Sequence, residues 1–315
     1  MKYLPKIALG TWSWGTGFAG GDTVFGNTLS DKQMADVFNA AMEKGLNLWD
    51  TAAVYGMGSS ETALGQLVRQ YPREEILLST KFTPQIADFA SAQPVTTMLE
   101  ASLQRLGVDE IDLYWIHNPA DVEKWTPALI PLLQNGKIKQ IGVSNHNLEQ
   151  IKRANAILGS AGFALSAVQN HYSLLYRSSE EAGILDYCHQ NNITFFAYMV
   201  LEQGALSGRY HPQNPMPAGS GRAETYNAVL PQLATLTGAM KAIGATRNAS
   251  VAQVAIAWAI AKGTLPLIGA TKVHHVLDAA GAADIQLSAG EIAQLEHLAK
   301  EAGVDTRGSW ENPMI

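Results

Sequence analysis

Four residues able to move a proton stand at or just after the ends of strand-like segments. Asp50, Lys81 and His117 each end an apolar segment, and Tyr55 follows Asp50 after five residues. A phenol has a pKa of ~10, and a neighbouring ammonium lowers it by favouring the phenolate. A carboxylate beside the ammonium keeps that group charged, and an imidazole can hydrogen-bond a substrate oxygen. Such a set is suited to protonating an oxygen after a hydride has reached the adjacent carbon.

Each of these residues has an ordinary explanation when it is considered alone. An aspartate at a strand end commonly caps a turn, and a tyrosine commonly packs. A lysine is usually solvated, and a histidine is more often a satisfied polar residue than a catalyst. Because three of them end consecutive strand-like segments and the fourth lies one short turn further, a barrel would bring all four to one mouth.

The elements that would position these residues alternate along the whole chain. Helical patterns fill the gaps between strand-like segments, and Ser30-x-x-Gln33, Ser250-x-x-Gln253 and Ser288-x-x-Glu291 predict capping boxes that start helices. The expected strands are Ile7–Leu9, Leu46–Asp50, Ile76–Lys81, Ile111–His117, Ile138–Ser144, Ala167–Asn170, Ile193–Tyr198 and Leu265–Ile268. Eight such segments predict an α/β fold with a closed (β/α)8 TIM barrel, and an open doubly wound sheet is the alternative.

No linker divides the sequence, so residues 1–315 are expected to form a single barrel domain. The Pro- and Gly-rich stretch His211–Arg222 is short, and we interpret it as a long loop after the seventh strand. The net charge of −6 and the lack of a Lys/Arg run predict no nucleic-acid partner. Cys188 is the only cysteine and is expected to be buried, and no signal-peptide or membrane-spanning pattern is present. These features predict a cytoplasmic protein without a membrane partner.

Short motifs occur in a fixed order from residue 7 to about residue 283. They are Gly10-Thr-Trp-Ser-Trp-Gly15, Asn47-Leu-Trp-Asp-Thr-Ala-Ala-Val-Tyr-Gly56, Leu78-Ser-Thr-Lys81, Ile116-His-Asn-Pro119, Ile141-Gly-Val-Ser-Asn145, Val168-Gln-Asn170, Ala197-Tyr-Met-Val-Leu-Glu-Gln-Gly204 and Ile268-Gly-Ala-Thr-Lys272. In this order the motifs resemble the aldo-keto reductase superfamily, and the resemblance covers nearly the whole chain.

The resemblance implies an NADPH-dependent reductase of aldehydes and ketones, with a small-molecule carbonyl substrate. It implies that Tyr55 donates the proton, that Asp50 and Lys81 tune it, and that His117 positions the carbonyl. A histidine at this position is typical of members that reduce carbonyl groups, whereas members that reduce activated C=C bonds carry glutamate. Trp12 and Asn118, together with Tyr55 and His117, would line the substrate site.

The resemblance also implies the residues that hold NADPH/NADP+. Ser144, Asn145 and Gln169 would grip the nicotinamide carboxamide, and Tyr198 would stack on its ring. A cation at Lys272 would face the 2′-phosphate and favour NADPH over NADH. The full set is Thr11, Trp12, Asp50, Ser144, Asn145, Gln169, Tyr198, Leu201, Gln203, Gly204, Leu206, Gly208, Ile268, Gly269, Thr271, Lys272 and His275.

The sequence departs from the family pattern in three places. Only six residues precede Ile7, so the hairpin that usually closes the barrel bottom is expected to be missing or truncated. His275 stands where the family usually has Gln or Arg, and Ala279 where it usually has Asn, which predicts weaker contacts with the adenine end. Asn118 replaces a frequent aromatic residue or Arg and so changes one wall of the substrate pocket.

Other folds and other kinds of site find less support in the sequence. The segment Gly15–Gly20 fits GxGxxG, but no helix is expected at Gly20, so a Rossmann fold is not predicted. HExxH, GxSxG, P-loop and Cys/His patterns are absent from the sequence, so no metal is predicted. Two rivals stay open: a redox-sensing module that binds NADPH tightly and turns over slowly, and a barrel isomerase or aldolase without nicotinamide. The second would need a Gly-rich phosphate loop, whereas Gly269 is single.

Overall fold

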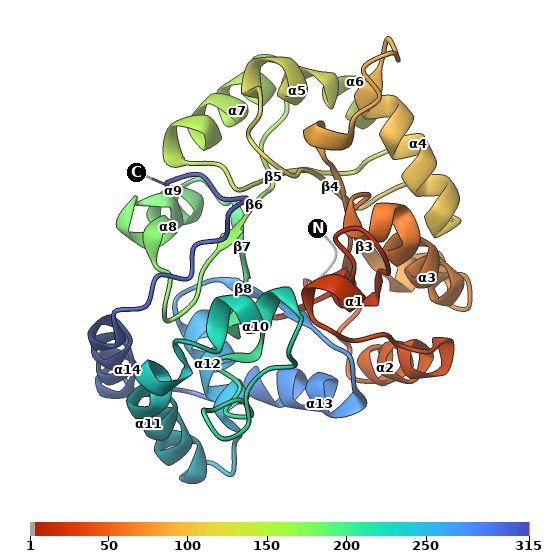
Figure 1. Cartoon of the computed structure of the whole chain (residues 1–315). Helices are drawn as coiled ribbons and strands as arrows, with labels where there is room; N and C mark the ends of the chain where they lie inside the picture. Colours follow the sequence, from red (N-terminus) through yellow and green to blue (C-terminus); the bar gives the residue numbers. More distant parts are fainter. Residues whose placement is uncertain (1–3, 315) are drawn as a thin grey trace.

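The computed structural model describes residues 4–314, and its strands form a closed parallel barrel (Figure 1). Neighbouring strands pair in chain order, and β8 pairs with β1 to complete the closure. The strands are β1 Ala8–Gly10, β2 Leu48–Asp50, β3 Leu77–Phe82, β4 Leu113–Ile116, β5 Ile141–Ser144, β6 Ala167–His171, β7 Thr194–Tyr198 and β8 Leu265–Gly269. All eight expected strands are present, so the (β/α)8 barrel is confirmed and the open doubly wound sheet is excluded.

Helices surround the barrel and fill the connections between strands (Figure 1). The capping boxes predicted at Ser30, Ser250 and Ser288 are all present, and Asn147 forms a further one with Gln150. The helices are α1 Gly21–Val24, α2 Asp31–Glu43, α3 Ser59–Val68, α4 Pro94–Leu106, α5 Val122–Ala128, α6 Ile130–Gln134, α7 Leu148–Ser160, α8 Ser178–Glu181, α9 Ile184–Gln190, α10 Gly221–Tyr226, α11 Ala234–Ala245, α12 Val251–Ala261, α13 Val273–Ala282 and α14 Ala289–Ala302.

The two-residue period of the strands divides their side chains between the barrel interior and the helix layer. Trp49, Leu78 and Tyr114 belong to the large core between strands and helices. Leu48 and Leu77 belong to the small cluster inside the barrel. In β2 and β3 the inner residue that follows is polar, so apolar side chains fill the lower barrel and polar ones its mouth.

Trp115 in β4 occupies the centre of the interior. Its ring packs edge-on against Phe196 with centroids 5.1 Å apart, and its indole Nε1 donates to Asp50 Oδ1 over 3.0 Å. A Cβ on Gly142 of β5 would lie 2.1 Å from the Trp115 ring, so only glycine fits there. Trp115 therefore separates the apolar interior from the polar mouth.

The other end of the barrel is open to a cavity of about 420 Å³. Leu48, Leu77, Leu113 and Phe196 line it from the interior, and Leu4 packs at the same place. No strand precedes β1 within the described residues, which begin at Leu4.

The stretch from His211 to Arg222 is a loop up to Ser220, after which α10 begins, as expected for a loop after the seventh strand.

The expectation that no helix starts at Gly20 was wrong, because the four-residue α1 begins at Gly21 with Gly20 as its N-cap. The helix has only one turn, and the chain before it forms a tight loop in which the Gly21 N–H donates to the Gly15 carbonyl over 2.6 Å. The barrel topology still excludes a Rossmann fold.

None of the helices within residues 4–314 has the length and apolar character needed to cross a bilayer.

Candidate active site

Asp50, Tyr55, Lys81 and His117 meet at the mouth of the barrel, as the strand ends predict. Lys81 Nζ forms a buried ion pair with Asp50 Oδ2 and donates to the Thr51 carbonyl over 2.8 Å. The same ammonium lies 3.4 Å from the Tyr55 hydroxyl oxygen. The rings of Tyr55 and His117 lie edge to face with centroids 5.8 Å apart. The phenol of Tyr55 therefore lies beside both an ammonium and an imidazole.

The carboxylate of Asp50 is held by a full set of donors. Besides Lys81, it accepts hydrogen bonds from Ser79 Oγ over 2.5 Å, Trp115 Nε1 over 3.0 Å and Gln169 Nε2 over 3.3 Å. Burial lowers the pKa of Lys81, but the charges of Asp50 and then Tyr55 outweigh burial, so the pKa is raised overall. Lys81 is therefore a fixed ammonium at neutral pH.

The net effect on Tyr55 differs from the expectation that the ammonium lowers its pKa. Burial raises the pKa of Tyr55, Lys81 lowers it, and Asp50 raises it again, with a net increase. The reason is that burial is the largest effect, and the charge of Asp50 opposes that of Lys81. Tyr55 is therefore kept protonated, as a proton donor must be.

His117 is held in the neutral form. Burial, followed by the nearby charge of Lys81, lowers its pKa well below the ordinary value. Its Nδ1 lies 2.9 Å from Thr83 Oγ1. When the threonine hydroxyl donates to Nδ1, the remaining proton is on Nε2, where it can be donated to a ligand oxygen.

Tyr55 is positioned by a tight turn after β2. Gly56 has φ +58°, and a Cβ there would lie 2.1 Å from Ser59 Oγ and 2.5 Å from the Thr16 carbonyl oxygen, so the turn requires glycine. The indole of Trp12 stacks on the Tyr55 ring with centroids 5.5 Å apart and an angle of 19°. The phenol is thus fixed from below by the turn and from the side by Trp12.

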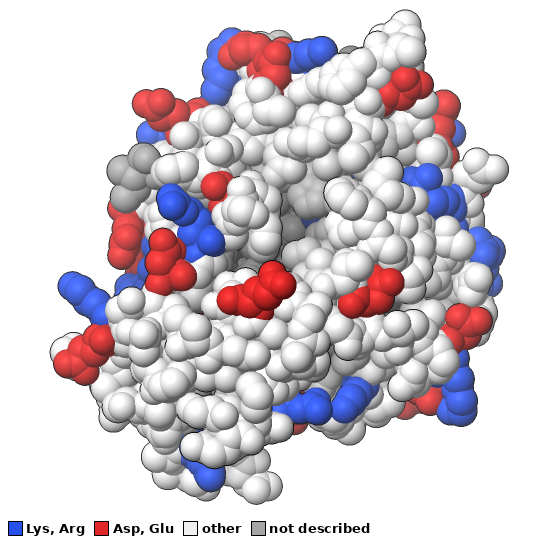
Figure 2. Space-filling view, viewed as in Figure 1, with Lys and Arg blue, Asp and Glu red and all other residues white. Residues whose placement is uncertain are grey.

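Aromatic side chains form the wall of the mouth around Trp12. Phe25 and Trp310 both pack edge-on against its indole, at 5.1 and 5.9 Å. Asn118 lies at the same mouth, where its amide nitrogen donates to Gln85 Oε1 over 3.1 Å. Figure 2 shows a hollow at the centre of this face whose walls are mostly uncharged.

Some aromatic residues in the segments that form the mouth do not line it. Trp14 and Phe82 are buried in the core between strands and helices, and Phe18 is exposed. Trp310 arrives from the C-terminal tail and Phe25 from the end of α1. Trp310 was expected at the pocket from the sequence, whereas Phe25 was not, because its place depends on how its segment folds back.

The residues expected at the nicotinamide carboxamide lie together at the ends of β5 and β6. Asn145 has φ +60° just after β5, and its amide nitrogen donates to the His117 carbonyl over 3.0 Å. Gln169 contacts Asp50, and the Tyr198 hydroxyl donates to Asn145 Oδ1 over 2.6 Å. Ser144 lies within 3.3 Å of the Asn145 amide. Two of the expected cofactor residues are therefore in direct contact with catalytic candidates, Asn145 with His117 and Gln169 with Asp50.

A cationic group lies at the N-terminus of α13. Lys272 is the exposed N-cap residue and makes no side-chain capping hydrogen bond. His275 Nδ1 accepts from the Thr271 N–H over 3.3 Å. Burial, then His274, Lys272 and Arg209, lowers the pKa of His275 to about 4. An uncapped helix N-terminus beside several cations is suited to an anion such as a phosphate.

Arg209 and Arg222 are two candidate residues that sequence reasoning missed. Both guanidinium groups lie over the Tyr210 ring, 5.4 and 5.1 Å from its centroid. Arg222 also donates to the Gln203 carbonyl over 3.2 Å, while Gln203 Oε1 is buried without a partner. Arg209 follows Gly208 directly, so its place beside the loop 201–208, which holds five of the expected cofactor residues, was a usable signal. Arg222 comes from α10, which no motif connects to that loop.

Some expected cofactor residues have side chains that do not reach the mouth. Thr11, Leu206 and Ile268 are buried, and the Thr11 hydroxyl lies 2.9 Å from Ser60 Oγ. Leu201 and Gly204 are half-buried, and Gly208 and Gly269 are exposed. The buried residues can offer a ligand only backbone groups or packing support.

Ala279, the position where the family usually carries Asn, faces inward. It is fully buried on α13 among the core side chains, whereas the neighbouring Asp278 is half-buried and accepts from Ser250 Oγ over 3.2 Å. The adenine contact expected at this position therefore has no open side-chain site in this structure.

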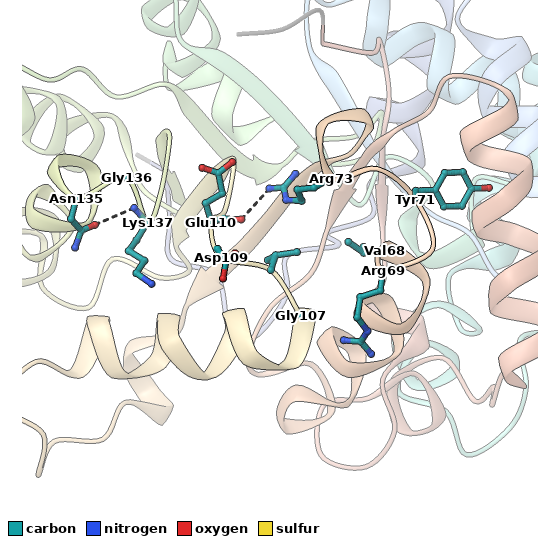
Figure 3. A pocket seen from close by; sticks show the side chains of 11 residues that line it. Val68, Arg69, Tyr71, Arg73, Gly107, Asp109, Glu110, Asn135, Gly136 and Lys137 are labelled. Atoms are coloured by element: carbon teal, nitrogen blue, oxygen red, sulfur yellow. Dashed lines mark hydrogen bonds between the residues drawn. The ribbon is translucent and has the colours of Figure 1, made fainter.

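A second cavity lies far from this chemistry. It has a volume of about 490 Å³ and is lined at the strand-entry end of the barrel by residues that include Arg69, Arg73 and Lys137 (Figure 3). Arg73 is occupied by the Ile76 and Glu110 carbonyls. In barrels this end serves stability, whereas chemistry belongs to the opposite end.

Residues 4–314 contain no cluster of His, Cys, Asp or Glu side chains arranged to hold a metal ion.

The chain resembles known proteins over nearly its whole length. The profile of the Aldo/keto reductase family matches residues 6–300. The chain is similar to a chloroplastic pyridoxal reductase of Arabidopsis thaliana, with 32% identity over 95% of this chain and 84% of the relative. It is similar to the NADP(+) aldo-keto reductase yakc of Schizosaccharomyces pombe, with 31% identity over 92% and 89%. A solved aldo-keto reductase of Klebsiella pneumoniae in complex with NADPH matches with a TM-score of 0.71 and 28% identity, over 94% and 91%.

Proposed function

The protein belongs to the aldo/keto reductase family, and we propose that it is an NADPH-dependent reductase that converts aldehydes and ketones to alcohols, with Tyr55 as the proton donor. As a member of this family it is an oxidoreductase that uses NADPH. We also propose that residues 1–315 act as a single domain, with the active site at the barrel mouth.

The observation that carries the proposal is the environment of the Tyr55 hydroxyl group. It lies 3.4 Å from Lys81 Nζ, whose charge is fixed by Asp50, and the ring that carries it packs edge to face with the ring of neutral His117. A carbonyl oxygen bound between the phenol and the imidazole would accept a hydrogen bond from each. As negative charge develops on that oxygen, Tyr55 transfers its proton, and the neighbouring Lys81 ammonium stabilises the phenolate that is left.

The residues at the mouth fit NADPH, which when bound supplies the hydride. Tyr198 offers a ring whose hydroxyl is fixed to Asn145, and Gln203 Oε1 is a buried acceptor without a partner. Lys272 and Arg209 lie beside the uncapped N-terminus of α13, where a phosphate group would be held. The mostly uncharged, aromatic walls around Trp12 suit an uncharged carbonyl compound (Figure 2).

The direct test is steady-state turnover with 4-nitrobenzaldehyde. We expect NADPH oxidation, followed at 340 nm, to require the aldehyde and to yield the alcohol, with kcat in the range of about 1–10³ s⁻¹ that is usual for enzymes. A protein that binds NADPH tightly but completes only a single turnover would instead favour the redox-sensing alternative. Failure to bind NADPH at all would exclude both.

Replacement of Lys272 by alanine tests the cofactor preference. A charge-assisted hydrogen bond contributes about 1.5–3 kcal/mol, so we expect the variant to lose roughly ten- to hundred-fold in NADPH affinity and little in NADH affinity. Fluorescence titration of both cofactors measures the two dissociation constants. Lys44→Ala, an exposed lysine at the end of α2, is the matched control. Equal affinities of the native protein for NADPH and NADH would contradict the assignment.

A further inference from the structure

A buried charged cluster that the proposed chemistry does not use lies beside the mouth. At its centre is His171, which is fully buried at the end of β6, two residues after Gln169. Its Nδ1 lies 2.9 Å from Glu311 Oε1, and its Nε2 lies 3.0 Å from Glu202 Oε1. A neutral imidazole can donate from only one nitrogen. Contacts of both nitrogens with carboxylates therefore indicate the cationic, doubly protonated form.

The imidazole ring of His171 is enclosed by two phenol rings. Tyr176 stacks on one side at 4.3 Å with an angle of 22°, and Tyr198 stacks at 5.6 Å with an angle of 25°. His171 and Tyr198 are also partners in the register of β6 and β7. A cation over an aromatic face is attracted to it, most strongly where water is excluded. The cluster is thus in contact with the ring that would stack on the nicotinamide.

Glu202 connects the cluster to the loop Met199–Gly208, which we call the cofactor loop. Its carboxylate also accepts hydrogen bonds from the hydroxyl groups of Ser173, Thr306 at 3.1 Å and Tyr226 at 2.6 Å. The backbone of Glu202 has φ +46°, a left-handed conformation that is costly for a residue with a side chain. Such a backbone persists when its surroundings hold it, and here the buried carboxylate supplies that hold.

Glu311 connects the cluster to the segment Asp305–Met314, which we call the C-terminal tail. Its Oε1 also accepts from the Gly308 N–H over 3.2 Å, and its side chain is fully buried. The residue before it, Trp310, packs on Trp12 at 5.9 Å and directs its indole N–H toward the Tyr198 hydroxyl at 3.4 Å. The tail therefore forms one wall of the substrate site and is fixed beneath that wall by Glu311.

We infer that His171 is a positioning residue: as a cation between Glu202 and Glu311, it holds the C-terminal tail and the cofactor loop against the Tyr198 ring. The wall of the substrate site and the ring that would stack on the nicotinamide are thereby fixed relative to each other. The role of Tyr198 in this inference rests on the proposed function, whereas the tie between the tail and the loop does not. Loss of the cation releases both segments, since each is held through a carboxylate that would then be buried without its counterion.

The ionic contacts of His171 with Glu202 and Glu311 depend on pH. Burial lowers the pKa of His171, but Glu202 and Glu311 outweigh burial and raise it to about 9. The pKa in a released state returns toward 6.5, so the stabilisation is complete below about pH 6.5 and is lost as the pH rises through about 9. The titratable and charged groups that face the cluster are Glu202, Glu311, Tyr176, Tyr198, Tyr226, Asp305 and Arg307. Burial raises the pKa of each of these tyrosines. As the pH rises, His171 therefore loses its proton before the tyrosines do.

Limited trypsin cleavage after Arg307 measures tail release without cofactor or turnover. The Arg307–Gly308 bond lies between the anchors Thr306 and Glu311. In the native protein we expect slow cleavage at pH 7 and faster cleavage above about pH 9, normalised to a peptide substrate. In Glu311→Gln we expect the rise to move to lower pH, because His171 loses one of its two carboxylates. We expect His171→Gln to be cleaved at least about ten-fold faster at pH 7 and to show no rise near pH 9.

Matched controls and a second readout separate this role from general destabilisation. His189→Gln on α9 and Glu301→Gln on α14 change exposed residues of the same types and should behave as the native protein does. Stopped-flow release of NADP⁺ should be about 5- to 150-fold faster in His171→Gln, the usual range for coupling between two sites. If the proposed function fails, the cleavage profile still stands. An unchanged profile in Glu311→Gln, or a tail in folded His171→Gln as protected as in the native protein, would overturn the inference.

Discussion

Replacement of Tyr55 by phenylalanine is expected to lower kcat for an unactivated ketone by about 10²- to 10⁴-fold, the usual contribution of a positioned general acid. The physical reason is that, in the proposed mechanism, the Tyr55 hydroxyl beside Lys81 donates the proton to the substrate oxygen. The phenylalanine ring keeps its packing against Trp12, at 5.5 Å, so the shape of the mouth should be preserved. Single-turnover reduction under saturating NADPH measures the effect on the chemical step.

The affinity for NADPH provides the internal control for this variant. In the proposed mechanism the phenol acts on the substrate oxygen, so the NADPH dissociation constant of Tyr55→Phe should change by less than about three-fold. Tyr71→Phe removes the hydroxyl that donates to Asn39 over 2.9 Å outside the site, and it should turn over normally. A Tyr55→Phe protein that keeps more than a few per cent of the native kcat would mean that another group is the acid.

Breaking the Lys81–Asp50 ion pair is expected to remove both turnover and stability. In Lys81→Met the carboxylate of Asp50 stays buried without its counterion, which costs about 3–5 kcal/mol of unfolding free energy. Turnover should fall as well, because the variant has no ammonium to stabilise the Tyr55 phenolate. Urea unfolding at equilibrium and NADPH-dependent reduction measure the two losses separately.

The double variant Asp50→Asn with Lys81→Met separates stability from catalysis. With neither charge present, the asparagine can still accept from Ser79 and Trp115, so most of the lost stability should return. Turnover should not return, since the ammonium is still absent. A double variant that regains activity together with stability would show that the pair is structural only, and a Lys81→Met protein as stable as the native one would show that the carboxylate is not paired as described.

The sequence by itself determined the barrel and the four catalytic candidates. Eight strand-like segments alternate with helical ones, and this periodicity is local, so it is readable without tertiary contacts. The boundaries were less accurate: β5 begins at Ile141 rather than at the expected Ile138. The reason is that Ile138 pairs with Ile111 in an isolated bridge before the regular strands begin. An apolar pattern predicts burial but does not distinguish such a bridge from a continuous strand.

Only the tertiary structure decided the pKa shifts in the site and the ionic contacts around it. The ammonium of Lys81 was expected to lower the pKa of Tyr55, yet burial, together with the charge of Asp50, reverses the net direction. His171 gave no signal, because its partners Glu202 and Glu311 lie 31 and 140 residues away in the chain. Local patterns determine which residues a strand presents to the barrel interior. The charges that meet there depend on how distant loops and the tail close over it, and no local spacing encodes that closure.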